Sequence, residues 1–249
     1  MIRLSNRLGA SLNLPVTVGW RRVPLLIGVP NVPNAHGDGN VVVGRRRIEA
    51  RQITLSGSIY YPSRQQIRDM ADTIMAFLQH APIEVFQWPG SPRRMYAYPQ
   101  GVDQDWMDAG AELVLNIPML VPDPYWYGAE VTATEENATA WQVEVDGTAP
   151  TPPVVRIEVT APGTDLLLTN STNGRTLLVE GSYLVGDVVT VYTATYEATL
   201  TRSGETSPIV DALGDEFVLA GFELEPDTNV LTYTGPAADV TLTYRPRWY

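Results

Sequence analysis

One segment of the chain repeats its apolar residues at the period of an α-helix. Ser63 follows a proline, and its hydroxyl can cap the backbone amide of Gln66, whose side chain can reach back in an S-x-x-Q capping box. After this start, apolar residues recur every three or four positions on one face: Ile67, Met70, Ala71, Ile74, Phe77 and Leu78. The pattern predicts a helix from Ser63 to His80 whose apolar face packs onto a sheet.

The rest of the first half alternates polar and apolar residues over short runs that turn residues interrupt. Such alternation is typical of half-buried strands. Loops are expected at 30–39, which is rich in Pro, Asn and Gly, and at the acidic stretch 103–110. We predict strands over residues 12–20, 23–29, 41–43, 49–61, 83–88, 94–98 and 111–121.

The second half shows only the period of β-strands. Its apolar runs follow one another at roughly 8 to 12 residue spacing, which favours an antiparallel β-sandwich without a helix. Asn173-Gly174 predicts a type I′ hairpin turn, because both central residues of that turn need positive φ. We predict strands over residues 141–145, 154–160, 165–170, 175–180, 188–192, 197–201, 217–219, 229–234 and 240–244.

Residues 129–140 are polar and have no apolar period, so we predict a linker there. It would separate an N-terminal domain at 1–128, a β-barrel or sandwich with one packed α-helix, from the C-terminal sandwich at 141–249. A chain of 249 residues is long enough for two such domains. The predicted fold class is mainly β.

Charge divides the chain in the same way. Residues 1–124 hold 12 Arg and 10 acidic residues, whereas residues 125–249 hold 5 Arg and 18 acidic residues, so the two halves carry +2 and −13. An acidic module repels nucleic-acid phosphates, and we expect no nucleic-acid partner for it. We also expect no membrane segment and no secretory signal, since no apolar run has the required length.

The candidate chemistry is sparse. The chain has no cysteine, which excludes disulfides and thiolate chemistry, and its two histidines, His36 and His80, stand alone. Known nucleophile, phosphate-loop and metalloprotease motifs are absent from the sequence. We therefore expect no catalytic residue, no metal ligand and no cofactor.

One acidic stretch resembles a calcium loop. Asp103, Asp105 and Asp108 slightly resemble its carboxylates, but Asp108 stands at the sixth position, where such loops need glycine, and no Glu stands at the twelfth. A solvated loop is the favoured interpretation, and a cation site is the alternative.

Three sets of residues, taken in order, resemble the distal tail proteins of long-tailed siphophages, the Dit-like tail components. The first is the capped helix followed by Ala81-Pro82-Ile83, and the second is the segment from Val121 to Tyr127, which reads V-P-D-P-Y-W-Y. The third is the C-terminal pattern of 170–175, Gly186-Asp187, 222–229 and the ending Y-R-P-R-W at 244–248. The family often has glycine where this chain has Asp227, which puts the turn geometry there in question.

The resemblance implies a structural, non-enzymatic role at the phage tail tip. The N-terminal domain would form a hexameric ring between the tail tube protein and the tail-tip hub, with the tape measure protein as a possible further partner. The C-terminal domain would be a galectin-like sandwich that projects outward. The protein would be part of the virion, at the tail tip, after assembly in the host cytoplasm.

Two groups of residues are candidates for assembly contacts. Arg45, Arg46, Arg47 and Arg51 could pair with carboxylates of a neighbouring subunit, or form a solvated loop. The aromatic triplet of Tyr125, Trp126 and Tyr127 could belong to the core or to a contact between domains.

Two other functions stay open. A module that binds host-surface carbohydrate could use Trp141, Tyr183, Tyr192 or Tyr196 as an aromatic platform, although both histidines of the chain lie outside the C-terminal half, so the galectin sugar signature is incomplete. A glycosidase would need a pair of carboxylates, which the many acidic residues of this half could hide.

Overall fold

The computed structural model describes residues 2–14, 18–22, 27–28, 31–33, 40–42, 47–48, 50–87, 91–101, 103–107 and 112–249. The chain divides into two compact units, one of residues 1–126 with residue 249 and one of residues 127–248. The chain passes from the first unit to the second within the short strand β13 (Trp126–Tyr127).

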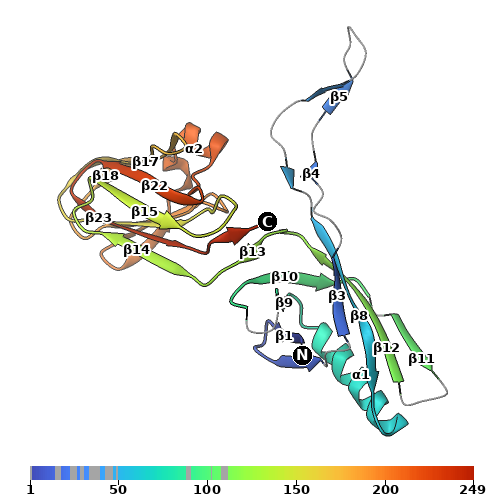
Figure 1. The fold of residues 1–249 in the computed structure, drawn as a ribbon. Coiled ribbons are helices and arrows are strands. Elements are labelled where there is room, and N and C mark those ends of the chain that lie inside the picture. The colour runs from blue at the N-terminus through green and yellow to red at the C-terminus, as the bar shows by residue number, and fades with distance from the viewer. Residues whose placement is uncertain are drawn as a thin grey trace. The chain divides into compact units, whose positions relative to one another are not determined.

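The first unit is built on antiparallel strands that run in the order β2-β1-β9-β10-β12-β8-β3, with β11 paired to β12 (Figure 1). The longest pairing joins β8 to β12 over ten residues of each strand. Apart from these, two short pairs join β4 (Ile27–Gly28) to β7 (Arg47–Ile48) and β5 (Asn31–Pro33) to β6 (Asn40–Val42). The strand bounds are β1 (Ile2–Asn6), β2 (Ser11–Leu14), β3 (Val18–Arg22), β8 (Arg51–Tyr60), β9 (Ile83–Phe86), β10 (Arg94–Pro99), β11 (Asp103–Met107) and β12 (Glu112–Val121).

The predicted helix is confirmed as α1 (Arg64–Leu78), with Ser63 as its N-cap. The Ser63 hydroxyl accepts a hydrogen bond from the backbone N–H of Gln66 at 3.3 Å. Figure 1 shows α1 alongside the long strands of the first unit. The buried face of the helix comprises Ile67, Ala71, Ile74, Phe77 and Leu78, which are all on the predicted face, whereas Met70 of that face is half-buried.

The second unit is a sandwich of two antiparallel sheets (Figure 1). One sheet has the order β14-β23-β16-β19-β20-β21 and the other the order β15-β22-β17-β18. The bounds in the first are β14 (Val131–Glu135), β16 (Val154–Val159), β19 (Val188–Tyr192), β20 (Glu197–Arg202), β21 (Glu205–Pro208) and β23 (Ala238–Tyr244); those in the second are β15 (Ala140–Val145), β17 (Gly163–Asn170), β18 (Arg175–Tyr183) and β22 (Asp227–Thr234). The mainly β fold class predicted from the sequence is confirmed.

The core of the sandwich follows the period of two in its strands. Val155, Ile157 and Val159 of β16 point to the same side and are at most 1% exposed, as are Leu166 and Leu168 of β17. Each large apolar side chain buried in this way contributes roughly 1.5 to 3 kcal/mol. The alternation read from the sequence therefore correctly located the core.

The predicted linker is wrong over residues 131–135, which form the edge strand β14 and pair with β23 from Val131 to Glu135. The strand lies at one end of its sheet, and its side chains are exposed or half-buried. An exposed edge strand does not need alternating apolar residues. The absence of such an alternation therefore did not indicate a linker. The acidic loop predicted at 103–110 likewise contains β11, whose five residues pair with β12.

Two predictions of local geometry in the sandwich are also wrong. Residues 215–220 form the helix α2 (Asp215–Ala220), preceded by the short 3-10 helix η1 (Val210–Ala212), where a strand at 217–219 was expected. Acidic residues in the first turn and a C-terminal glycine, Gly221 at φ +71°, favour this helix. Asn173-Gly174 is not a type I′ turn, because only Gly174 has positive φ and four residues separate β17 from β18.

Candidate functional site

The arginine group predicted as an assembly contact lies only partly within the described residues. Arg45 and Arg46 lie outside them, and Arg47 is described only as part of the backbone of β7. Arg51 begins β8 and is half-buried. The proposed role of this group in assembly stays a prediction.

The aromatic triplet divides between the two units. Trp126 is 5% exposed and belongs to the core of the first unit, where the ring of Tyr125 lies 5.6 Å from that of Tyr249. Tyr127 belongs to the second unit, and its hydroxyl accepts a hydrogen bond from Arg247 Nη2 at 3.0 Å. The guanidinium of Arg247 also lies 5.2 Å from the centre of the Tyr127 ring, within cation–π range.

The C-terminal ending that resembles the tail proteins closes the sandwich through its backbone. Within β24 (Arg247–Trp248), the Arg247 carbonyl accepts hydrogen bonds from the backbone N–H groups of Thr148 and Ala149, at 2.9 and 3.2 Å. The Pro246 carbonyl accepts one from Gly128 at 2.9 Å. These bonds hold the last residues of the second unit against Gly128 near its start and against Thr148 and Ala149.

A buried pair of asparagines holds two further segments of the family pattern together, 170–175 and 222–229. Asn170 and Asn229 are both 0% exposed, and Asn170 Nδ2 donates to Asn229 Oδ1 at 2.9 Å. Asn229 in turn accepts from the backbone N–H of Glu225 at 2.8 Å and donates to its carbonyl at 2.7 Å. Asn170 Nδ2 also donates to the Glu223 carbonyl at 3.1 Å. Buried amides with partners of this kind fix loop geometry, since leaving them unbonded is costly.

Asn173 completes this asparagine network, defined here as Asn170, Asn173, Asn229, Glu223 and Glu225. Its Nδ2 donates to the Glu223 carbonyl at 2.9 Å and to Glu225 Oε1 at 3.2 Å. The neighbouring Asp227 has φ +70°, a left-handed conformation that favours glycine and that aspartate tolerates better than most residues. The turn therefore keeps a backbone suited to the glycine that the family often has there.

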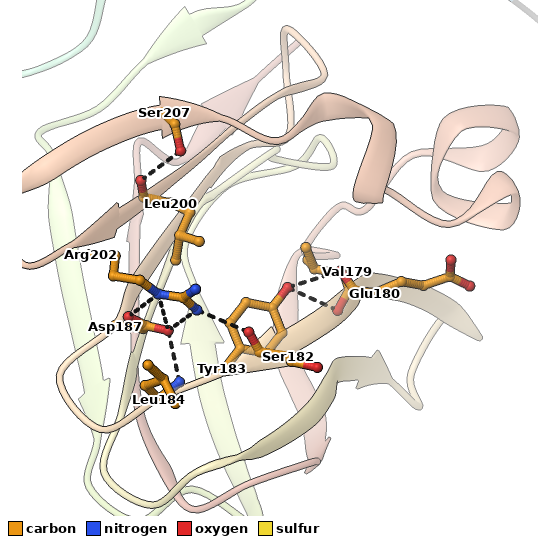
Figure 2. Close-up of polar contacts among 9 residues, drawn as sticks. All are labelled: Val179, Glu180, Ser182, Tyr183, Leu184, Asp187, Leu200, Arg202 and Ser207. Carbon is orange, nitrogen blue, oxygen red and sulfur yellow. Dashed lines mark hydrogen bonds and ion pairs between the residues drawn. The ribbon is translucent and has the colours of Figure 1, made fainter.

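A second buried group centres on Asp187, which is 2% exposed (Figure 2). Arg202 donates from Nε to Asp187 Oδ1 at 2.9 Å and from Nη2 to Oδ2 at 2.5 Å. The same Nη2 donates to the Ser182 carbonyl at 2.9 Å, and the backbone N–H of Leu184 donates to Asp187 Oδ2 at 2.8 Å. The hydrogen bonds from Arg202 hold the pKa of Asp187 below its ordinary value, although burial acts to raise it. The hydrogen bond from the Leu184 N–H also lowers this pKa.

The aromatic residues considered for carbohydrate binding are not equally available. Tyr183 is 3% exposed, and its hydroxyl donates to the carbonyls of Val179 and Glu180 (Figure 2). Burial raises the pKa of Tyr183 to about 12. Trp141 packs against the sandwich core, whereas Tyr192 and Tyr196 keep 42% of their surface exposed. Tyr183 is thus a core residue and no part of a sugar platform.

The cation site considered at 103–108 falls partly on described residues. Asp103 and Asp105 are in β11, and Asp108 lies outside the described residues. Over the part of the chain that the structure describes, no three His, Asp or Glu residues gather as metal ligands would, and no helix is long and apolar enough to cross a membrane.

The motifs considered in the sequence do not mark the asparagine pair or the Asp187 group as structural centres. A signal for the former was present, because Asn170 continues the inward positions of Leu166 and Leu168, and Asn229 shares its face with Leu231. A polar residue at a core position of a strand needs a buried partner. For Asp187 and Arg202 the sequence carries no such periodic signal.

Comparison with known proteins bears on the resemblance noted in the sequence. Residues 146–248 match the family model of the siphovirus-type tail component, C-terminal domain. Over its whole length the chain is similar to the crystal structure of the Dit protein (gp 19.1) of phage SPP1, described as a paradigm of the hub adsorption apparatus in phages that infect Gram-positive bacteria. The two chains are 17% identical, each is covered over 100% of its length, and the TM-score is 0.76.

Weaker similarity extends to two structures of the phage P2 baseplate in its activated conformation, one with Ca and one with Sr. Each is 9% identical over 97% of both chains, with a TM-score of 0.49. No curated protein matches the chain. The resemblance to the siphophage distal tail proteins is therefore confirmed: the sandwich matches the family model of a siphovirus-type tail component, and the chain as a whole has the fold of SPP1 Dit.

Proposed function

We propose that this chain is a structural component of a phage tail tip, a distal tail protein that forms a hexameric ring and catalyses no reaction. The first unit would form the ring between the tail tube protein and the tail-tip hub proteins, with the tape measure protein as a further neighbour. The observation that carries the proposal is the agreement of fold with SPP1 Dit over the full length of both chains.

The charge distribution supports ring formation through the first unit rather than through the sandwich. Residues 125–249 carry 5 Arg and 18 acidic residues, so six copies of the sandwich repel one another when they are close. The first half is close to neutral and lacks this repulsion. Association through the first unit is therefore favoured, with the sandwiches spaced apart in solvent.

The test is the mass and shape of the purified intact protein. We expect light scattering to give a hexamer and negative-stain electron microscopy to show a ring, and we expect the protein in purified phage particles at the tail tip. Residues 1–126 alone should associate, and residues 127–249 alone should stay monomeric. A protein that stays monomeric and is absent from every particle contradicts the proposal.

The arginine group gives a sharper version of this test. Replacing Arg45, Arg46 and Arg47 by serine should weaken ring assembly, because carboxylates of a neighbouring subunit lose bidentate partners. A matched control replaces Arg156, Arg175 and Arg245 of the sandwich by serine and removes the same charge. Equal assembly by both variants rejects the role assigned to this group.

A further inference from the structure

The turn between β17 and β18 contains the only Asn-Gly pair of the chain, Asn173-Gly174. In such a pair the backbone nitrogen of glycine reaches the carbonyl carbon of the asparagine side chain with little hindrance, because glycine has no Cβ. Attack by this nitrogen releases the side-chain amide. The pair is therefore chemically reactive wherever its backbone is free to move.

In the folded sandwich both reacting groups are engaged. The nucleophile, the backbone nitrogen of Gly174, donates its hydrogen to the Asn170 carbonyl at 2.8 Å. On the electrophile, Asn173 Nδ2 donates to Glu223 and Glu225, and Asn173 Oδ1 accepts from the backbone N–H of Arg175 at 3.1 Å. Attack requires the asparagine network to open first.

We propose that Asn173 is a conditional deamidation site, protected while this end of the sandwich is closed and converted once it opens. The Gly174 nitrogen loses its proton and forms a bond to Asn173 Cγ. The Cγ–Nδ2 bond breaks, and the amide leaves as ammonia after taking up a proton. Water then opens the resulting succinimide and leaves either aspartate or isoaspartate at position 173.

The product cannot restore the network. The amide of Asn173 donates to the Glu223 carbonyl and to the Glu225 carboxylate, whereas a carboxylate has no hydrogen to donate and carries the same charge as Glu225. Both partners lie in the segment that Asn170 and Asn229 hold in place. Deamidation of Asn173 therefore makes the opening of the loop irreversible, and the product favours further opening.

The first experiment follows conversion at residue 173 of the full-length protein by peptide mass spectrometry at mildly alkaline pH. We expect the folded protein to convert at least about tenfold more slowly than the same protein in urea, since opening of the network limits the reaction. Equal rates of conversion in the folded protein and in urea overturn the proposal, independently of the results with variants.

The second experiment opens the network without denaturant. Asn229→Ala removes the side chain that binds Glu225, and we expect it to speed conversion about tenfold or more while circular dichroism shows a folded protein. Asp187→Asn, which disturbs the other buried group, is the control and should leave the rate unchanged. A folded Asn229→Ala protein with the rate of the natural sequence overturns the proposal.

A third experiment tests the effect of the product. Asn173→Asp and Asn173→Ala both remove the donated hydrogen bonds, but only the former adds a charge beside Glu225. We expect the midpoint of urea unfolding of Asn173→Asp to be lower than that of Asn173→Ala. Equal midpoints for the two variants reject the claim that the charged product favours further opening of the loop.

Discussion

At the scale of single residues, the buried polar groups of the sandwich should stabilise it more than its exposed ion pairs do. Asp187 is 2% exposed and receives hydrogen bonds from Arg202 and from a backbone N–H. The pair Arg156–Glu158 has a similar length, 2.8 Å, but both side chains are more than 40% exposed. Exposed pairs of this kind contribute little to stability, because water screens them.

We predict that Asp187→Asn lowers the free energy of unfolding by about 1 to 3 kcal/mol at neutral pH, because the charged partner of Arg202 is lost. Folding lowers the pKa of Asp187, so its contribution is present above the unfolded-state pKa, near 4, and is lost as the pH falls through the folded-state pKa. Urea unfolding curves measured over a pH series should therefore converge for the two proteins in acid.

The control for this prediction is Glu158→Gln, which should change the free energy of unfolding by no more than about 0.5 kcal/mol. A loss for Asp187→Asn no larger than that of the control contradicts a stabilising role for Asp187. A difference that persists unchanged into acid contradicts its electrostatic origin.

At the scale of elements, the long periodic segments were predicted correctly, whereas the edge strand β14 and the short helix α2 were not. Helix α1 and strand β16 show their buried faces directly in the sequence. The edge strand β14 and the six-residue helix α2 show no such pattern, because only Phe217 of α2 is buried and β14 has no fully buried residue. An element that buries little leaves little trace in apolar periodicity.

The backbone of β24 leaves no room for a side chain at Gly147. Gly147 has φ +125°, and a Cβ at this position would collide with the backbone of Arg247. We predict that Gly147→Ala costs about 3 kcal/mol or more, because the strained φ and the collision add. Thermal or urea unfolding of the full-length protein measures this loss.

Gly204→Ala is the matched control. Gly204 also has positive φ, +85°, but a Cβ there would meet open space, so only the conformational cost of about 1 kcal/mol applies. Similar losses in the two variants would show that β24 does not hold Gly147 closely.

At the scale of the whole molecule, the two units have separate cores. The buried cluster of the sandwich draws all its residues from positions 138 to 244. Its packing therefore needs no side chain of the first unit. The change from a nearly neutral first half to an acidic second half falls close to the same division.

We predict that residues 127–249 fold alone and unfold in one cooperative transition, since the complete core is present. Calorimetry should give a melting temperature that matches a transition of the full chain. Ile157→Ala, at a fully buried position, should lower that temperature in both proteins, at a cost of about 2 to 5 kcal/mol. An isolated sandwich without a cooperative transition contradicts the prediction.

The sequence by itself determined the mainly β fold class, the helix capped by Ser63 and the apolar face of most sandwich strands, because helix and strand periods are local properties. It also carried, in degenerate motifs, the resemblance to the tail proteins. Only the tertiary structure decided that those motifs are the asparagine network and the C-terminal backbone contacts of Arg247. Asn170 and Asn229 lie 59 residues apart, and Arg247 lies farther still along the chain from Thr148 and Ala149, so local periodicity holds no information about these pairs.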